Sequence, residues 1–311
     1  MAALTQQQQK FFWRNGYLVV PDAVSDGMLV ELRQTFQNWV EESREHAENW
    51  GETLNGKPRF DIEPGHCADS PRLRRVNAPI EVSKAYFDAM SDSTMTDFVA
   101  DLIGPDVKLH HTKINSKQPG AETVVKWHQD FPFFPHTNTS LVVVMVMLDD
   151  ATPENGCMYV VPGSHKFGPL EHHVDGWFTG CSQEPLPNNY LSQYSSGPIA
   201  VTPSAGGISI HHCLALHMSP PNLSGRSRRG LVFQYRSSDA HALAGSLVPD
   251  CGWQVSGSYD GRVRCEEASW KLPRKFLRKG GGGTEIGYGD VWNQVGTRAK
   301  EWNPPFEAVS K

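Results

Sequence analysis

Two short stretches of the sequence contain residue types that can bind one metal ion together. The stretch KWHQDF (126–131) places His128 and Asp130 two positions apart. On a β-strand these side chains would lie on the same face and could reach the same ion. A second stretch, LALHMS (214–219), adds His217. Two imidazoles and one carboxylate match the ligand set of non-haem Fe(II) oxygenases, which leaves coordination positions open for a cosubstrate and O2.

The surroundings of His217 support this grouping. Strand alternation puts Ala215 and His217 on one face, so His217 can point into a barrel lined by small residues. Arg228 follows shortly afterwards and begins another alternating segment. A guanidinium inside such a barrel could hold the far end of a dicarboxylate through two parallel hydrogen bonds.

Each of these residues also has a simpler explanation. An isolated H-x-D triplet is weak evidence in a chain with 13 histidines. Cys157 and Cys213 are expected to be small core residues, and Arg226 and Arg229 to be surface charges. We expect the remaining histidines near the motifs to be solvated or hydrogen-bonded structural residues: His110, His111, His136, His172, His173, His211 and His212. The combination of residues in one order, rather than any single residue, favours the metal site.

Composition limits the partners and the compartment. The chain has 311 residues, a net charge of -5 and no long basic run, so a small-molecule substrate is expected rather than nucleic acid or a membrane surface. The six cysteines form no C-x-x-C pair, which is typical of reduced thiols. The first residues lack a signal-peptide pattern, and no run approaches the ~18 apolar residues that a membrane span needs. We expect a cytoplasmic protein that is a monomer or a homodimer.

The hydrophobic pattern predicts helices first and strands afterwards. Residues 11–20 read as a short opening strand or turn, and 41–79 as irregular surface with a possible strand at 59–62. Apolar residues recur at helical spacing in 28–40, 86–90 and 95–103. From 107 onward the pattern changes to short β-rich runs, at 107–115, 124–130, 139–148, 157–161, 208–212, 214–219 and 230–235.

This order predicts a mainly β protein with supporting helices. The expected core is a double-stranded β-helix, a cupin-like jelly roll, with the N-terminal helices packed on one sheet. We expect one domain over 1–311, with a helical N-terminal part (1–104), a jelly-roll core (105–240) and a C-terminal extension (241–311) that includes Trp253, Trp270, Trp292 and Trp302. The segment between His165 and Ala200 is expected to form a loop over one mouth of the barrel.

Four motifs together resemble those of a known family. They are WHQD (127–130), LDDATPENGCM (148–158), VPGSHK (161–166), and HMS (217–219) with Asn222 and Arg228 behind it. Through them the chain, from about Phe11 to Tyr235, resembles the phytanoyl-CoA dioxygenase family of Fe(II)- and 2-oxoglutarate-dependent oxygenases.

The resemblance implies roles for particular residues. His128, Asp130 and His217 would bind Fe(II), and Arg228 and Ser219 would hold the distal carboxylate of 2-oxoglutarate. Further cosubstrate contacts would come from Gln129 and Lys113, although Lys113 departs from the apolar residue expected at its position. The implied reaction is hydroxylation of an unactivated C–H bond by O2, with succinate and CO2 as coproducts.

Aromatic residues beside the ligand pair suggest a substrate site. We expect Phe131, Phe133 and Phe134, with the loop 167–190, to line the substrate mouth; ordinary packing is the alternative. Three other functions stay open: desaturation, epimerisation or ring formation with the same cofactors, a jelly roll that binds a ligand without turnover, and a zinc hydrolase. The sequence does not identify the substrate, which could be an acyl-CoA, an amino acid derivative, a phosphonate or a terpenoid-like natural product.

Overall fold

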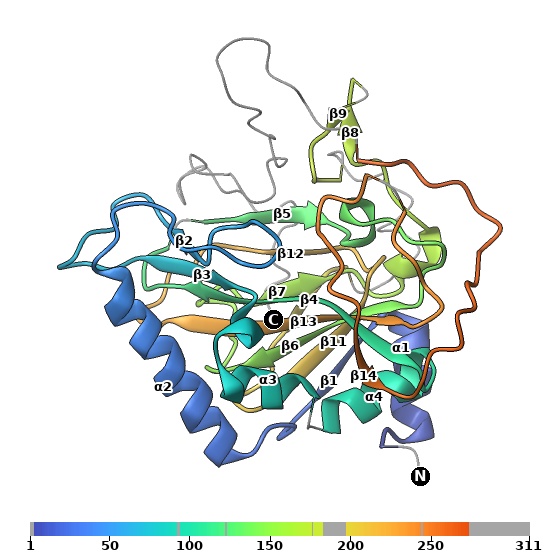
Figure 1. The fold of residues 1–311 in the computed structure, drawn as a ribbon, viewed down its shortest axis with the longest axis horizontal. Coiled ribbons are helices and arrows are strands. Elements are labelled where there is room, and N and C mark those ends of the chain that lie inside the picture. Colours follow the sequence, from blue (N-terminus) through green and yellow to red (C-terminus); the bar gives the residue numbers. More distant parts are fainter. Residues whose placement is uncertain are drawn as a thin grey trace.

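Two antiparallel β-sheets face each other, and helices lie against the larger one (Figure 1). This architecture comes from a computed structural model that describes residues 3–91, 94–121, 123–175, 177–182, 197–243 and 245–273. Within these residues the helices are α1 (Gln6–Asn15), α2 (Asp26–Ser43), α3 (Lys84–Ser91) and α4 (Thr94–Ile103), with short 3-10 turns at Pro79–Glu81, Phe131–Phe133 and Ser164–Phe167.

The larger sheet has the strand order β1-β11-β6-β13-β4-β3-β2, and β14 pairs with β4 beside this path. Its strands are β1 (Tyr17–Val20), β2 (Phe60–Ile62), β3 (Leu73–Asn77), β4 (Val107–Lys117), β6 (Leu141–Met147), β11 (Ile208–His212), β13 (Arg228–Ser237) and β14 (Trp253–Ser256). The smaller sheet has the order β10-β7-β12-β5, with β5 (Val125–His128), β7 (Met158–Val160), β10 (Ile199–Val201) and β12 (His217–Ser219). A separate hairpin joins β8 (His173–Val174) and β9 (Trp177–Phe178).

Alternation along the strands divides the larger sheet into two faces. On β6, Val142, Val144 and Val146 are buried in one apolar core with the helices. The intervening Val143 and Met145 point to the opposite face, toward the smaller sheet, because successive side chains of a strand alternate. The jelly-roll prediction and the packing of helices on one sheet are therefore confirmed, and the space between the sheets remains for a site.

The interpretation of 11–20 as an opening strand or turn was wrong for its first half. Helix α1 extends through Asn15, and only Tyr17–Val20 forms a strand. A capping box starts the helix, because the Thr5 hydroxyl accepts a hydrogen bond from the Gln8 N–H while the Gln8 side chain accepts one from the Thr5 N–H. Gly16 ends it with φ 80°, a left-handed conformation that suits glycine.

The larger sheet draws strands from outside the 105–240 segment. The N-terminal part contributes β1, β2 and β3 as well as helices, and β14 comes from the C-terminal extension. Trp253 of β14 packs edge-on against Phe87, with ring centroids 5.4 Å apart. Trp292 and Trp302 lie outside the described residues.

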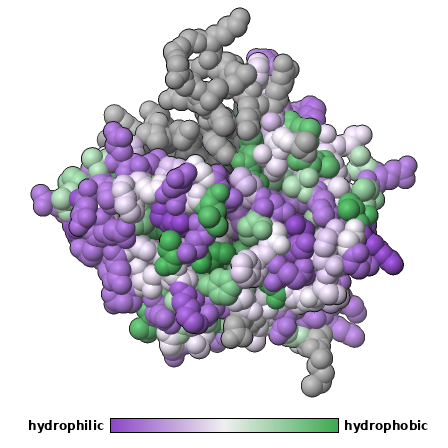
Figure 2. Space-filling view, in the orientation of Figure 1, coloured by the Kyte–Doolittle hydropathy of each residue, from purple (hydrophilic) through white to green (hydrophobic). Residues whose placement is uncertain are grey.

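The visible surface mixes polar and apolar residues. Figure 2 shows apolar residues in small groups between hydrophilic ones on the side that it draws. In the described part of the chain, no helix has the length and apolar character needed to cross a membrane.

The packing of α2 on the sheet gives a first prediction. Leu32 is fully buried, whereas Val30 on the same helix is 63% exposed. Leu32→Ala should lower the free energy of unfolding by ~2–5 kcal/mol, because it leaves a cavity between helix and sheet. Val30→Ala, the matched control, should change it by no more than about 0.5 kcal/mol. Urea denaturation measures both values, and equal losses in the two variants would contradict this packing.

Candidate metal and cosubstrate site

Pairing of two strands in the smaller sheet brings the two predicted histidines together. His217 on β12 is the register partner of His128 on β5. Asp130 lies just beyond β5, in an α-type conformation, so the expectation that it shares a strand face with His128 was wrong. Instead, the turn that carries Asp130 is held because the N–H groups of Asp130 and Phe131 both donate to the Cys213 carbonyl, each at 3.0 Å.

The three side chains form a compact cluster of possible metal ligands. One ligand atom from each of His128, Asp130 and His217 lies within 4.8 Å of the others. His128 Nε2 is 3.8 Å from Asp130 Oδ1, and His217 Nε2 is 4.0 Å from Asp130 Oδ2. These separations exceed hydrogen-bond length and leave room for an ion between the three atoms.

Backbone carbonyls orient both imidazoles. His128 Nδ1 lies 2.8 Å from the Lys126 carbonyl oxygen, and His217 Nδ1 lies 2.9 Å from that of Ala215. A carbonyl only accepts, so each Nδ1 carries the proton and each Nε2 presents a lone pair toward Asp130. This is the arrangement that metal-binding histidines usually have, and the residues therefore fit a metal ion.

The charge states also suit a divalent cation. Burial lowers the pKa of His128 and of His217, which favours neutral imidazoles. Burial alone would raise the pKa of Asp130, but the neighbouring His217 and the hydrogen bond from His211 hold it well below its ordinary value. The cluster thus offers two neutral nitrogen donors and one carboxylate, a set without thiolate that suits Fe(II).

His211 is a contact that the sequence did not reveal. It lies on β11, and its Nε2 is 3.2 Å from Asp130 Oδ2. Because a carboxylate accepts, Nε2 donates and fixes the orientation of Asp130. The sequence pattern suggested only a structural histidine here, and nothing in its spacing from the two motifs indicated this contact.

We predict that the His211 contact tightens metal binding. His211→Phe should raise the Kd for Fe(II) by roughly 10–100-fold, the usual cost of losing a hydrogen bond to a ligand. His211→Gln, which keeps an N–H donor, should lose less. Anaerobic competition with a chromogenic chelator measures both affinities. An unchanged Kd in the Phe variant would show that Asp130 needs no such support.

Arg228 and Ser219 lie together beside the cluster and line the same cavity. Arg228 Nη2 donates to Ser219 Oγ at 3.3 Å, and the Ser219 hydroxyl donates to the Gly156 carbonyl at 2.8 Å. Arg228 Nε is buried without a hydrogen-bond partner in the described structure. Leaving such a donor unsatisfied costs about 1–3 kcal/mol, so the guanidinium fits a carboxylate ligand. Burial lowers the Arg228 pKa to about 10.

Lys117 supports this end of the site and was missed in the sequence. Its Nζ donates to three backbone carbonyls, those of Thr123 at 2.9 Å, Ser219 at 3.2 Å and Pro220. Register pairing places Lys117 opposite Arg228 on the neighbouring strand. Lys117 therefore ties β4 to the segment that carries Ser219.

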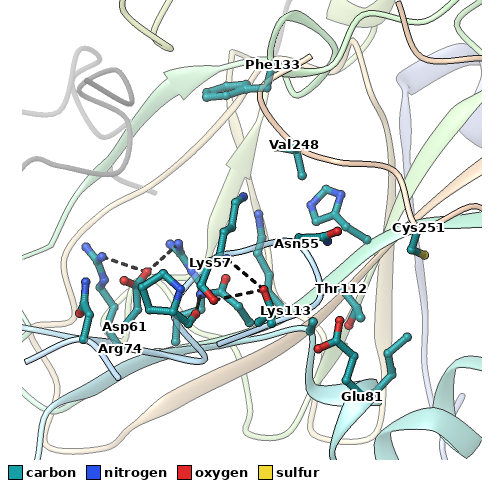
Figure 3. Close-up of a pocket in the computed structure, with 18 residues that line it drawn as sticks. Asn55, Lys57, Asp61, Arg74, Glu81, Thr112, Lys113, Phe133, Val248 and Cys251 are labelled. Carbon is teal, nitrogen blue, oxygen red and sulfur yellow. Dashed lines mark hydrogen bonds and ion pairs between the residues drawn. The ribbon is translucent and has the colours of Figure 1, made fainter. Parts of the chain in front are cut away.

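Two adjoining cavities lie beside the cluster of His128, Asp130 and His217. The smaller, about 90 Å³, is lined by His128, Asp130, His211, His217 and Arg228 among others. The larger, about 240 Å³, is drawn in Figure 3 and is lined by residues from the 49–61 segment, β3 and β4. Lys113, Arg74 and Arg75 belong to both linings. Lys113 thus lies where the two cavities meet.

Gln129 does not line either cavity. Its Nε2 donates to the carbonyls of Leu214 at 2.7 Å and Gly168 at 3.0 Å, and its Oε1 accepts from the Leu170 N–H at 2.7 Å. All three bonds join the metal motif to neighbouring loops. In the structure the Gln129 side chain therefore holds these loops against the motif, whereas the resemblance implied a contact with the cosubstrate.

The three phenylalanines occupy different environments. Only Phe133 lines the larger cavity (Figure 3). Phe131 packs against Trp270, with ring centroids 4.9 Å apart, and Phe134 packs against His110 at 4.7 Å. In the part of the 167–190 loop that the structure describes, no residue lines either cavity; its positions 176 and 183–190 lie outside the described residues.

The neighbouring arginines also differ from each other. Arg226 is exposed, as expected of a surface charge. Arg229 instead forms a bidentate ion pair with Asp149. Its Nε donates to Oδ2 at 2.8 Å and its Nη2 donates to Oδ1 at 2.7 Å. Arg229 was expected to be a surface charge, but its side chain is only 17% exposed and is paired with Asp149 of the LDD motif.

Comparison with known proteins agrees with this geometry. The family model described as Phytanoyl-CoA dioxygenase (PhyH) matches residues 12–230. A probable alpha-ketoglutarate-dependent hypophosphite dioxygenase from Stutzerimonas stutzeri is 35% identical over 192 residues, which cover 60% of this chain and 65% of that protein. The match thus spans slightly less than two thirds of that relative's length. Human peroxisomal phytanoyl-CoA dioxygenase is 24% identical over 246 residues, covering 77% of this chain and 70% of that one.

A solved structure shares the fold. EctD from S. alaskensis with 2-oxoglutarate and 5-hydroxyectoine superposes with a TM-score of 0.62 at 21% identity, over 88% of each chain. Fold and site together define a cupin-like jelly roll in which two histidines and a carboxylate gather between the sheets. The chain belongs to the phytanoyl-CoA dioxygenase family of Fe(II)- and 2-oxoglutarate-dependent oxygenases.

Proposed function

We propose that this protein is an Fe(II)- and 2-oxoglutarate-dependent dioxygenase that hydroxylates an unactivated C–H bond of a small molecule. The observation that carries the proposal is the cluster of His128 Nε2, the Asp130 carboxylate and His217 Nε2, with both imidazoles oriented by backbone carbonyls. These atoms would hold the iron. Arg228, positioned by Ser219, would bind the distal carboxylate of 2-oxoglutarate.

Bound Fe(II) and 2-oxoglutarate would supply the oxidation, in which O2 is consumed, 2-oxoglutarate becomes succinate and CO2, and one oxygen atom enters the substrate. The residues of the chain would orient and enclose the reactants. His211 holds the Asp130 carboxylate in one orientation. Val143, Met145 and Met158 give the smaller cavity an apolar wall, which would limit the access of water to a bound metal.

The proposal includes the setting of the enzyme. We infer a single catalytic unit over the whole chain, because strands from 1–104 and from the 241–311 extension complete the sheet that lines the site. All six cysteines are free thiols, which suits the reducing cytoplasm. A monomer or a homodimer would suffice, since all the proposed ligands come from one chain.

Anaerobic titration with Fe(II) and then 2-oxoglutarate tests the cofactor assignment. The wild type should develop the visible charge-transfer absorption that this cosubstrate gives when it chelates Fe(II), and His217→Ala should not. Arg228→Lys should raise the Kd for 2-oxoglutarate on the order of tenfold, because a lysine cannot donate the two parallel hydrogen bonds of a guanidinium. Arg226→Lys, an exposed change on the same segment, is the matched control and should leave the Kd unchanged.

Two outcomes would contradict the proposal. Absence of the absorption in an iron-loaded wild type would favour a ligand-binding jelly roll or another metal. Equal effects of Arg228→Lys and Arg226→Lys would remove Arg228 from the cosubstrate site. Succinate formed with Fe(II) in the absence of substrate would separate the enzyme from a non-catalytic binder, and product analysis would separate hydroxylation from desaturation, epimerisation or ring formation.

A further inference from the structure

The 49–61 segment, which the sequence pattern indicated as irregular surface with a possible strand, contributes the largest share of residues to the lining of the larger cavity. The other lining residues come from β3, from β4, from residues 78–81, which include η1 (Pro79–Glu81), and from Phe133, Val248 and Cys251. The register of the sheet aligns Asp61 of β2 with Arg75 of β3 and Asn115 of β4. Strand pairing therefore fixes these three polar side chains in one row, and Arg75 in its middle lines both cavities.

Cations outnumber carboxylates on the wall of this cavity. Four cationic side chains line it together with two carboxylates: Lys57, Arg74, Arg75, Lys113, Asp61 and Glu81. Asp61 is shared by Arg75 at 2.9 Å and Arg74 at 3.2 Å. Glu81 bonds at 2.7 Å to Arg59, a cation that is not part of the wall. The formal charges of these six groups therefore sum to a positive value.

The two lysines are directed to the same space. In Figure 3, Lys57 and Lys113 extend in the same direction, toward Phe133 and Val248. Loss of water around the amines, followed by repulsion from Arg75, lowers the pKa of Lys57 to about 8 and that of Lys113 to about 7. A bound anion would relieve the repulsion that these two amines share with Arg75.

The size of the cavity limits the ligand. A volume of about 240 Å³ corresponds to roughly eight water-sized groups and is below the ~300–1,000 Å³ that is usual for drug-sized ligands. A free small molecule fits this space far better than a coenzyme A ester. Lys113 also lines the smaller cavity, so a ligand held there would extend toward His128 and His217.

We propose, on the basis of the function proposed above, that the substrate is a small aliphatic oxyanion, a carboxylate or phosphonate, whose charged group binds between Lys57 and Lys113. Its carbon chain then points to the cluster of His128, Asp130 and His217. Phe133, which lines the same cavity, would pack against this chain.

Calorimetric titration under anaerobic conditions, on protein loaded with Fe(II) and 2-oxoglutarate, tests this proposal. The probes are propylphosphonate, butyrate and the neutral butyramide, and comparison of the first two identifies the head group. We expect the preferred anion to bind at least about tenfold more tightly than the amide. Lys57→Met should weaken binding of that anion by about tenfold and leave binding of the amide unchanged.

Matched variants keep the test interpretable. Lys57→Arg retains the charge and should retain the preference for an anion, whereas Lys10→Met removes an exposed charge on α1 and should change nothing. The charge-transfer absorption with 2-oxoglutarate, recorded on each variant, reports folding and the cofactor assignment independently. If the wild type lacked this absorption, the proposed function would be contradicted. The same probes titrated into metal-free protein would then still test the preference for anions. Equal affinity for anions and amide, no binding of either anion, or no effect of Lys57→Met would overturn the inference.

Discussion

The site depends on the antiparallel pairing of β5 with β12. This pairing places His128 and His217 opposite each other on neighbouring strands of the smaller sheet, where both line the smaller cavity. Backbone carbonyls two residues upstream then fix both imidazoles, and the Cys213 carbonyl holds the turn that brings Asp130 to them. Main-chain carbonyls thus restrain both imidazoles, and His211 restrains the Asp130 carboxylate, so the three ligand groups are positioned before any ion binds.

The larger sheet supplies the charges that surround this cluster. One face of the sheet is apolar and packs on the helices, while the other carries Arg75, Lys113 and Arg228 into the space between the sheets. Placing cations in such a space is costly unless anions compensate them. Asp61 and Asp130 compensate part of the charge. This surplus of cations suits the two anionic ligands that we propose, 2-oxoglutarate and a small oxyanion substrate.

The elements whose apolar residues follow a helical or strand period could be predicted from the sequence. The helical spacing in 28–40 and the β-rich runs from 107 onward appear as α2 and the strands of the two sheets. The first helix was missed because its signal is a capping box rather than an apolar stripe. His211 and Lys57 were missed for another reason: they reach the site only through sheet register and a long irregular segment, which no local spacing encodes. Gln129 shows the reverse case. Its position in the motif suggested a contact with the cosubstrate, but its buried side-chain amide forms hydrogen bonds with the neighbouring loops.

The most direct test of the central claim is the anomalous diffraction of a crystal grown anaerobically with Fe(II) and 2-oxoglutarate and measured at the iron absorption edge. The account predicts one iron peak bounded by His128 Nε2, the Asp130 carboxylate and His217 Nε2, with the distal carboxylate of 2-oxoglutarate on Arg228. A peak elsewhere, or 2-oxoglutarate bound without contact to Arg228, would contradict it.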